Sequence, residues 1–295
     1  MARFGQVLTA MVTPFAADGG LDLDGAQTLA RWLVDNGNDA LVVAGTTGES
    51  ATLSHGEQGE LIAAVVDAVD VAVIAGAGSN DTRAAVDLTE RATAAGATGI
   101  LQVTPYYNRP SQAGLESHFR AAAAATDLPV MLYDIPARTG RKIATATMLK
   151  LAHDVDNIVA LKDAGGDPAE TARFVAEAPS GFDVYSGDDR LTLPLLAVGA
   201  IGVVGVATHW AAVEMGQMIE AFRGGDVRSA IERNQALLAS FEFEGSDLAP
   251  NPIPTKALLK VLGLPGGDCR SPMGPEPDDL ADRARQVLAG LGRAV

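Results

Sequence analysis

The chain has 295 residues, and its 37 acidic against 22 basic residues give a formal net charge of −15. Because no stretch gathers lysine and arginine, this acidity excludes a nucleic-acid-binding surface. The single cysteine, Cys269, excludes an internal disulfide framework and a cysteine-rich zinc site, and it fits a reducing compartment. A chain of this length can form one large domain or two small ones.

The N-terminal segment MARFGQVLTAMVTPF carries one arginine and lacks an apolar stretch followed by a small-residue cleavage site, so we expect no secretory signal. Apolar runs elsewhere are broken by Gly, Asp or Pro before they reach the roughly 18 residues of a membrane span. We therefore expect a cytoplasmic protein that has no membrane partner.

Short apolar segments alternate with alanine-rich amphipathic stretches along the chain. The apolar segments begin, in chain order, at Val7, Ala40, Val71, Gly99, Pro129, Asn157, Phe182 and Ala200. They are continuously apolar, as strands buried on both faces of a parallel sheet are, and each ends in turn-forming residues. The stretches between them include LARWLVDNG, LIAAVVDAV, AAVDLTERATAAG and HFRAAAAAT, which have the apolar spacing of helices.

This alternation fits either a closed barrel or an open doubly wound sheet. Eight evenly spaced strands favour the closed form, an α/β fold of the (β/α)8 TIM-barrel type. We assign residues 1–207 to the barrel core. Residues 208–295 are assigned to the eighth barrel helix and a C-terminal helical appendage, with helices in EMGQMIEAF, VRSAIERNQALLASF and TKALLKVL and a last one from about Pro277.

In a barrel of this type, reactive residues lie where strands end and the following loops begin. Lys162 ends the apolar segment NIVALKD, so its amine is expected to enter the barrel mouth, where desolvation favours the neutral, nucleophilic form. The alternative is an ion pair with the adjacent Asp163. The other four lysines lie in polar or helical contexts and are expected to be solvated, namely Lys142, Lys150, Lys256 and Lys260.

Hydroxyl and guanidinium groups follow neighbouring strands. Tyr133 lies in the segment PVMLYDI, and Thr46 and Thr47 follow the second predicted strand. A phenol with a hydroxyl neighbour can carry a proton to and from a carbinolamine, although Tyr133 can also be a packing residue. Tyr107 follows the fourth strand. Arg138 lies in the loop after the fifth, where it either clamps a carboxylate or remains a surface residue.

Other kinds of site are not supported. The four histidines are far apart and lack the spacing of metal ligands, so we expect no metal site. Asp188 and Asp189 could hold a divalent cation, but we prefer to interpret them as caps of the following helix. The glycine-rich pieces AGTTGES and SGDD lack the P-loop lysine and the dinucleotide-binding spacing, which excludes nucleotide binding.

Seven segments form a specific combination. They are GTTGESATL from Gly45, VTPYYNRPSQAGL from Val103, LYDIPARTG from Leu132, ALKDAGGD from Ala160, YSGDD from Tyr185, GVVGV from Gly202 and NPIPTK from Asn251. Together they resemble the dihydrodipicolinate synthase family of class I pyruvate-dependent aldolases, over nearly the whole chain. The resemblance implies condensation of pyruvate with L-aspartate 4-semialdehyde to 4-hydroxy-tetrahydrodipicolinate, the first committed step toward diaminopimelate and lysine, with no metal or organic cofactor.

The same resemblance assigns catalytic roles. Lys162 matches the lysine that forms the Schiff base, and Tyr133 matches the general acid and base. Thr46 and Tyr107 match the rest of the proton relay. In the family this second tyrosine reaches across a tight dimer interface, so Tyr107 would serve the neighbouring subunit. The implied assembly is a homotetramer built from tight dimers.

The resemblance also assigns substrate contacts. Thr47 and the backbone of Val204 match positions that hold pyruvate, and Arg138 matches the clamp on the carboxylate of the aldehyde substrate. Gln58 and Ala84 stand where lysine-inhibited members carry a histidine and a glutamate, so the resemblance does not support feedback inhibition by lysine.

Alternatives to this activity remain within and outside the superfamily. N-acetylneuraminate lyase and 2-keto-3-deoxy-sugar-acid aldolases share the lysine and the first tyrosine, so the choice depends on Tyr107 and Arg138, which suit a short carboxylated aldehyde. A catalytically silent relative that only binds a 2-oxo acid is the alternative outside enzymes. Asp134 stands where many members have asparagine, which we interpret as an effect on the neighbouring Tyr133.

Overall fold

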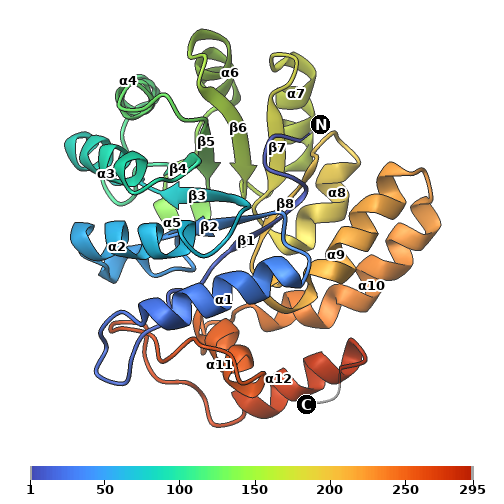
Figure 1. Ribbon diagram of the computed structural model, residues 1–295. Helices are drawn as coiled ribbons and strands as arrows, with labels where there is room; N and C mark the ends of the chain where they lie inside the picture. The colour runs from blue at the N-terminus through green and yellow to red at the C-terminus, as the bar shows by residue number, and fades with distance from the viewer. Residues whose placement is uncertain (1, 294–295) are drawn as a thin grey trace.

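Eight parallel strands close into a barrel in chain order, and β8 pairs back onto β1 (Figure 1). The structure, a computed structural model, describes residues 2–293. The strands are β1 (Val7–Ala10), β2 (Ala40–Val43), β3 (Ala72–Gly76), β4 (Gly99–Val103), β5 (Val130–Asp134), β6 (Ile158–Asp163), β7 (Asp183–Ser186) and β8 (Gly202–Gly205). The predicted TIM barrel and the predicted position of each strand are confirmed.

Helices surround the barrel and connect successive strands (Figure 1). They are α1 (Leu23–Asp35), α2 (His55–Val66), α3 (Thr82–Ala94), α4 (Gln112–Ala123), α6 (Thr145–Asp154), α7 (Pro168–Glu177), α8 (Thr192–Leu196) and α9 (Thr208–Arg223), with the single turn α5 (Pro136–Thr139) after β5. Several begin at a side-chain cap that accepts from a first-turn N–H, as Asp22, Ser54 and Ser111 do. These caps explain why the helices start soon after the loops at the strand ends.

Two layers of apolar side chains hold the barrel together. Strand residues that point inward, such as Leu8, Val42 and Ile74, fill the interior. Outward-pointing strand residues, such as Leu41 and Val73, pack against the surrounding helices. Both faces of each strand are therefore buried, which is why the strands are continuously apolar in sequence.

The last part of the chain is helical, as predicted. α10 (Val227–Phe243) packs on α9, and α11 (Ile253–Val261) packs on α12 (Leu280–Gly290) (Figure 1). A separate apolar cluster that includes Trp210, Phe241 and Leu258 joins these helices. The segment 244–252 between α10 and α11 has no regular structure, and most of it reaches the barrel mouth.

Lys256 contradicts the prediction that it is solvated. It lies on α11 and is only 2% exposed, and its Nζ is 2.7 Å from Glu49 Oε1 and 4.2 Å from the centroid of the Phe15 ring. Glu49 belongs to the loop after β2 and also accepts a hydrogen bond from the Arg270 N–H at 2.9 Å. The position of Lys256 in a helical stretch could not show that α11 packs onto this loop. The ion pair ties the C-terminal region to one side of the barrel mouth.

Lys256→Ala is expected to lower the free energy of unfolding by about 3–5 kcal/mol, because it leaves the Glu49 carboxylate buried without a cation. Urea unfolding followed by circular dichroism measures the change. Lys260→Ala is the matched control on the same helix. Lys260 is about half exposed and pairs with Asp268 and Glu276 at the surface, so its loss should cost about 1 kcal/mol or less. Equal losses in the two variants would contradict a stabilising buried pair.

Candidate active site

A cavity of about 430 Å³ opens at the carboxyl ends of the strands. Loops after β2, β5, β6, β7 and β8 line it, together with residues of the segment 244–251. The polar residues of its wall are Thr46, Thr47, Tyr133, Arg138, Lys162, Asp188, Asp189, Arg190, Glu244, Ser246, Asp247 and Asn251. Five residues predicted from the sequence therefore meet in one place, namely Thr46, Thr47, Tyr133, Arg138 and Lys162.

Lys162 is an isolated amine in this cavity. It is 5% exposed, and within residues 2–293 no carboxylate lies within 4 Å of its Nζ. Burial, with a contribution from the positive charge of Arg138, lowers the pKa of Lys162 to about 8. A larger fraction of this amine is therefore neutral near pH 7 than for an ordinary lysine, and the neutral amine is the nucleophile.

Asp163 is not the partner of Lys162. Successive residues of a strand point to opposite faces, and the Asp163 carboxylate accepts instead from the Thr171 hydroxyl at 2.6 Å and from the Gly165 N–H at 2.8 Å. This arrangement removes the alternative interpretation of Lys162 as one half of a structural ion pair.

Tyr133 stands beside Lys162 on the neighbouring strand. The two residues are register partners in the pairing of β5 with β6, and Lys162 Nζ is 4.4 Å from the centroid of the Tyr133 ring. Burial raises the pKa of Tyr133 to about 12, although a hydrogen bond with the Thr46 side chain opposes this shift. The phenol therefore stays protonated at neutral pH, and the Thr46 hydroxyl lies next to it in the cavity wall.

Groups that can bind the carboxylate of a ligand lie around the Lys162 amine. Arg138 reaches the cavity from α5, and it forms no ion pair with any described residue. Asn251 donates from Nδ2 to the Thr47 hydroxyl at 3.0 Å, and its buried Oδ1 has no partner among residues 2–293. Asn251 was not identified as a site residue from the sequence. Its only signal there was its place in the segment NPIPTK.

Two further carboxyl groups, those of Asp189 and Glu244, line the cavity on the β7 and α10 side and were not predicted as site residues. Asp189 is 1% exposed; its Oδ2 accepts from the Val206 N–H at 2.9 Å, and its Oδ1 has no partner in the described chain. Burial raises the pKa of Asp189 to about 6 and that of Glu244 well above its ordinary value. The sequence predicted that Asp188 and Asp189 cap the following helix. Asp188 has this role, because its carboxylate accepts from the Arg190 N–H at 3.0 Å.

Tyr107 and Val204 lie outside the cavity wall. Tyr107 is 90% exposed on the loop after β4, with a φ of 73°, a left-handed conformation that is uncommon for a tyrosine. Its N–H donates to the Thr139 carbonyl at 3.3 Å, which ties this loop to α5. Val204 is fully buried within β8, and Val206 is the β8-side residue in the wall.

Neither metal ligation nor membrane insertion is indicated by the described part of the chain. Residues 2–293 contain no group of three or more His, Cys, Asp or Glu side chains arranged to hold a metal ion. Among the same residues, no helix combines the length and apolar character that crossing a bilayer requires.

Residues 3–290 match the Dihydrodipicolinate synthetase family. The chain belongs to this family. It is 51% identical to the 4-hydroxy-tetrahydrodipicolinate synthase of Moorella thermoacetica, over 92% of each chain. It is also 51% identical to that of Acidothermus cellulolyticus, over 99% of this chain and 94% of the other. A solved dihydrodipicolinate synthase from Cyanidioschyzon merolae, with lysine bound, is 45% identical and superposes over 99% of both chains with a TM-score of 0.96.

The resemblance stated from the sequence motifs is thus confirmed at the level of the family and of the fold. All five predicted residues in the cavity come from motifs that carried the resemblance: Tyr133 and Lys162 lie in β5 and β6, and the other three lie in the loops after β2 and β5. The individual catalytic and binding roles stay predictions.

Proposed function

We propose that this protein is a 4-hydroxy-tetrahydrodipicolinate synthase, a lyase of the class I aldolase type that condenses pyruvate with L-aspartate 4-semialdehyde in diaminopimelate and lysine biosynthesis. The observation that carries the proposal is the buried amine of Lys162 beside the Tyr133 phenol, in a chain that is half identical to such synthases along almost its whole length.

The chemistry follows from a neutral Lys162 Nζ. It attacks the ketone carbon of pyruvate, and loss of water from the carbinolamine leaves an iminium. The iminium acidifies the pyruvate methyl group, and loss of a proton gives an enamine whose carbon attacks the aldehyde carbon of the second substrate. The amine of that substrate then attacks the iminium carbon, which closes the ring and releases Lys162. One water is lost overall, and the bound pyruvate itself serves as the electron sink, so we expect no cofactor.

Tyr133 supplies the proton transfers in this scheme. Its phenol is protonated at neutral pH, so it can donate to the hydroxyl that leaves the carbinolamine. The phenolate formed in that step is a base for the pyruvate methyl group. Thr46 is its hydrogen-bond partner and passes the proton onward.

The carboxylates of the two substrates need separate partners. We assign the carboxylate of pyruvate to Thr47, whose hydroxyl is held by Asn251 at 3.0 Å, together with the backbone of Val204, two residues before Val206 of the cavity wall. We assign the carboxylate of the aldehyde substrate to Arg138, because a guanidinium without an acidic partner binds a carboxylate through two parallel hydrogen bonds. Holding the two substrates at a fixed distance and orientation raises the rate, because their translational freedom is already lost on binding.

Tyr107 is proposed to complete the relay of a neighbouring subunit. The exposure of its side chain on a loop anchored to α5 suits a residue that leaves its own subunit. The assembly that this requires is at least a tight dimer, and we propose the homotetramer of tight dimers implied by the resemblance. Light scattering tests the assembly, and a monomer would contradict the shared relay.

Mixing two impaired variants tests the shared tyrosine. Tyr107→Phe and Lys162→Ala homodimers are each expected to be nearly inactive, whereas hybrids contain one site with both Lys162 and a tyrosine from its partner. Random exchange makes half of the dimers hybrid, so activity should return to about a quarter of the wild-type value. If the mixed sample is no more active than the two variants measured apart, Tyr107 does not act across an interface.

The substrate pair is tested by assay. Turnover with pyruvate and aspartate semialdehyde is measured beside cleavage of N-acetylneuraminate and of 2-keto-3-deoxy-gluconate. The proposal expects activity only in the first assay. Sugar-acid cleavage without turnover of aspartate semialdehyde would assign the chain to another aldolase of the superfamily.

The pH dependence of Schiff-base formation should report the environment of Lys162. At saturating pyruvate, the rate of formation should rise with pH as the amine loses its proton, with a midpoint near pH 8 and a plateau at higher pH. Arg138→Gln removes a nearby positive charge and should move the midpoint to higher pH. Asp189→Asn removes a nearby negative charge and should move it to lower pH. Borohydride quenching at timed intervals measures the rates, and shifts of the same sign in both variants would contradict this assignment.

A further inference from the structure

A second cavity, outside the barrel mouth, concentrates positive charge. It measures about 510 Å³, and its wall includes residues of α4, of the connection from α5 to α6, of the start of α6 and of α7. Its charged residues are Arg109, Arg141, Lys142, Arg173 and Glu170. Four cations against one carboxylate is the reverse of the balance in the chain as a whole, whose net charge is −15.

The acidic neighbours of this cavity do not neutralise its arginines. Lys142 Nζ is 2.7 Å from Glu170 Oε2 and 3.5 Å from Asp134 Oδ2, so both carboxylates are paired with the lysine. No carboxylate of residues 2–293 lies within 4 Å of the guanidinium nitrogens of the other three cations, Arg109, Arg141 and Arg173.

Unsatisfied donors accompany these charges. Arg141 Nε is buried and has no acceptor in the described chain, and a buried donor without a partner is destabilising. α6 begins without a side-chain cap, because Ala144 occupies the cap position. Thr145 and Ala146 of its first turn line the cavity, and their N–H groups form no hydrogen bond with residues 2–293. The N-terminus of a helix attracts negative charge.

The cavity wall is held in place by one side chain of α4. Gln112 donates from Nε2 to the Lys142 carbonyl at 2.9 Å, and its Oε1 accepts from the Ala144 N–H at 3.0 Å. These two bonds fix the loop that enters α6. The backbone at the start of α6 is therefore fixed before any ligand arrives, which lowers the entropic cost of binding at that end of the cavity.

We propose that this cavity binds a small dicarboxylate. The three arginines come from separate elements, the loop after β4, the connection before α6, and α7, so their charges are spread around a broad cavity. A ligand with two separated carboxylates matches this spread, one bound by guanidinium forks and the other at the start of α6. The site shares no wall residue with the catalytic cavity, and the inference does not depend on the proposed function.

Titration calorimetry with succinate tests the site on the full-length protein at low ionic strength. We expect saturable binding of one succinate per chain. Arg141→Gln and Arg173→Gln should each weaken it at least tenfold, which is about 1.4 kcal/mol. Arg31→Gln is the matched control, because Arg31 is an exposed arginine of α1 without an acidic partner, and it should bind succinate as the unmodified protein does. Arg173 is exposed on α7, so its replacement leaves the fold intact.

Three outcomes would overturn the proposal. The first is absence of saturable succinate binding. The second is loss of binding in Arg138→Gln with no change in Arg141→Gln and Arg173→Gln, which would place the ligand in the catalytic cavity. The third is tighter binding of inorganic phosphate than of succinate with the same dependence on Arg141 and Arg173, which would assign the site to a single-centre anion.

Discussion

Lys162→Ala is expected to lower turnover of pyruvate with aspartate semialdehyde by at least about 10⁴-fold, because it removes the amine that we propose forms the covalent intermediate. The same variant should form no adduct when pyruvate and borohydride are added, as measured by intact mass. Lys162 is buried and unpaired, so alanine leaves no opposing carboxylate of an ion pair behind, and the protein should stay folded.

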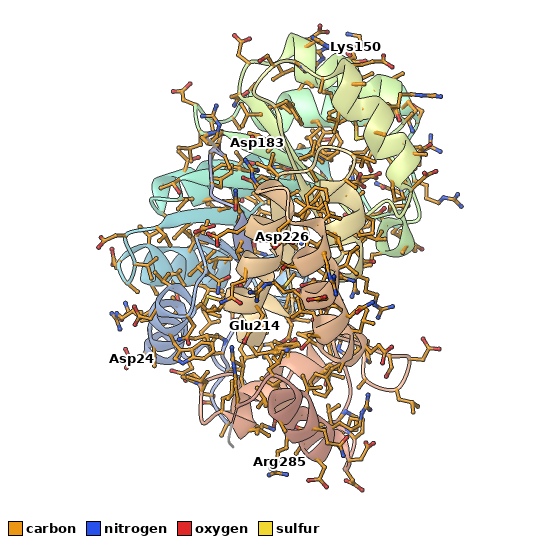
Figure 2. The ribbon with its side chains drawn as sticks, turned by 90° about the vertical axis from the view of Figure 1, so that its right-hand side faces the viewer. Asp24, Lys150, Asp183, Glu214, Asp226 and Arg285 are labelled. Carbon is orange, nitrogen blue, oxygen red and sulfur yellow. The ribbon has the colours of Figure 1, made fainter. Side chains whose placement is uncertain are left out.

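Lys150→Ala is the matched control for this variant. Lys150 is a half-exposed lysine on α6, labelled at the upper end of the molecule in Figure 2, where it pairs with Glu116 and Asp154. Its replacement should leave both turnover and adduct formation unchanged. An adduct of normal mass in Lys162→Ala would show that another amine reacts, and the Schiff-base assignment would fail.

The fold could be predicted because each strand carries its own local signal. Segments such as NIVALKD are continuously apolar and end in polar residues, so both the strand and the emergence of Lys162 at its end follow from the pattern. The order of strands in a parallel barrel then follows the order of the chain. The clustering of Thr46, Tyr133 and Lys162 needs nothing beyond this topology, since all three lie at or just after strand ends.

The rest of the site depends on packing between distant segments, which no local pattern encodes. The segment 244–251 reaches the barrel mouth because α10 and α11 fold back onto the barrel, so Glu244 and Asn251 could not be assigned to the site from periodicity. Lys256 looked like a solvated lysine for the same reason, until α11 placed it against Glu49. For Tyr107 even the packing within one chain is not enough, because the site that it is proposed to complete belongs to another subunit.

Tyr133→Phe is expected to lower kcat by about 10²- to 10⁴-fold, the usual contribution of a positioned acid or base. The ring and its contact with Lys162 are kept, so pyruvate should still form an adduct, but more slowly than in the unmodified protein. Single-turnover borohydride trapping separates this slow formation from the loss of condensation. A variant that forms the adduct and turns over at the normal rate would show that Tyr133 only packs against Lys162.

Tyr185→Phe provides the comparison that makes the Tyr133 result specific. Tyr185 is the register partner of Lys162 on β7, and it is also buried, but its hydroxyl donates to the Gly5 carbonyl at 3.0 Å and does not line the catalytic cavity. Losing that hydrogen bond should cost about 0.5–1.5 kcal/mol of stability and leave kcat unchanged. The two tyrosines flank the same lysine at the same level of the barrel. Both variants lose a buried hydroxyl, so a fall in kcat in Tyr133→Phe that is absent from Tyr185→Phe would be due to the proton carried by the Tyr133 hydroxyl.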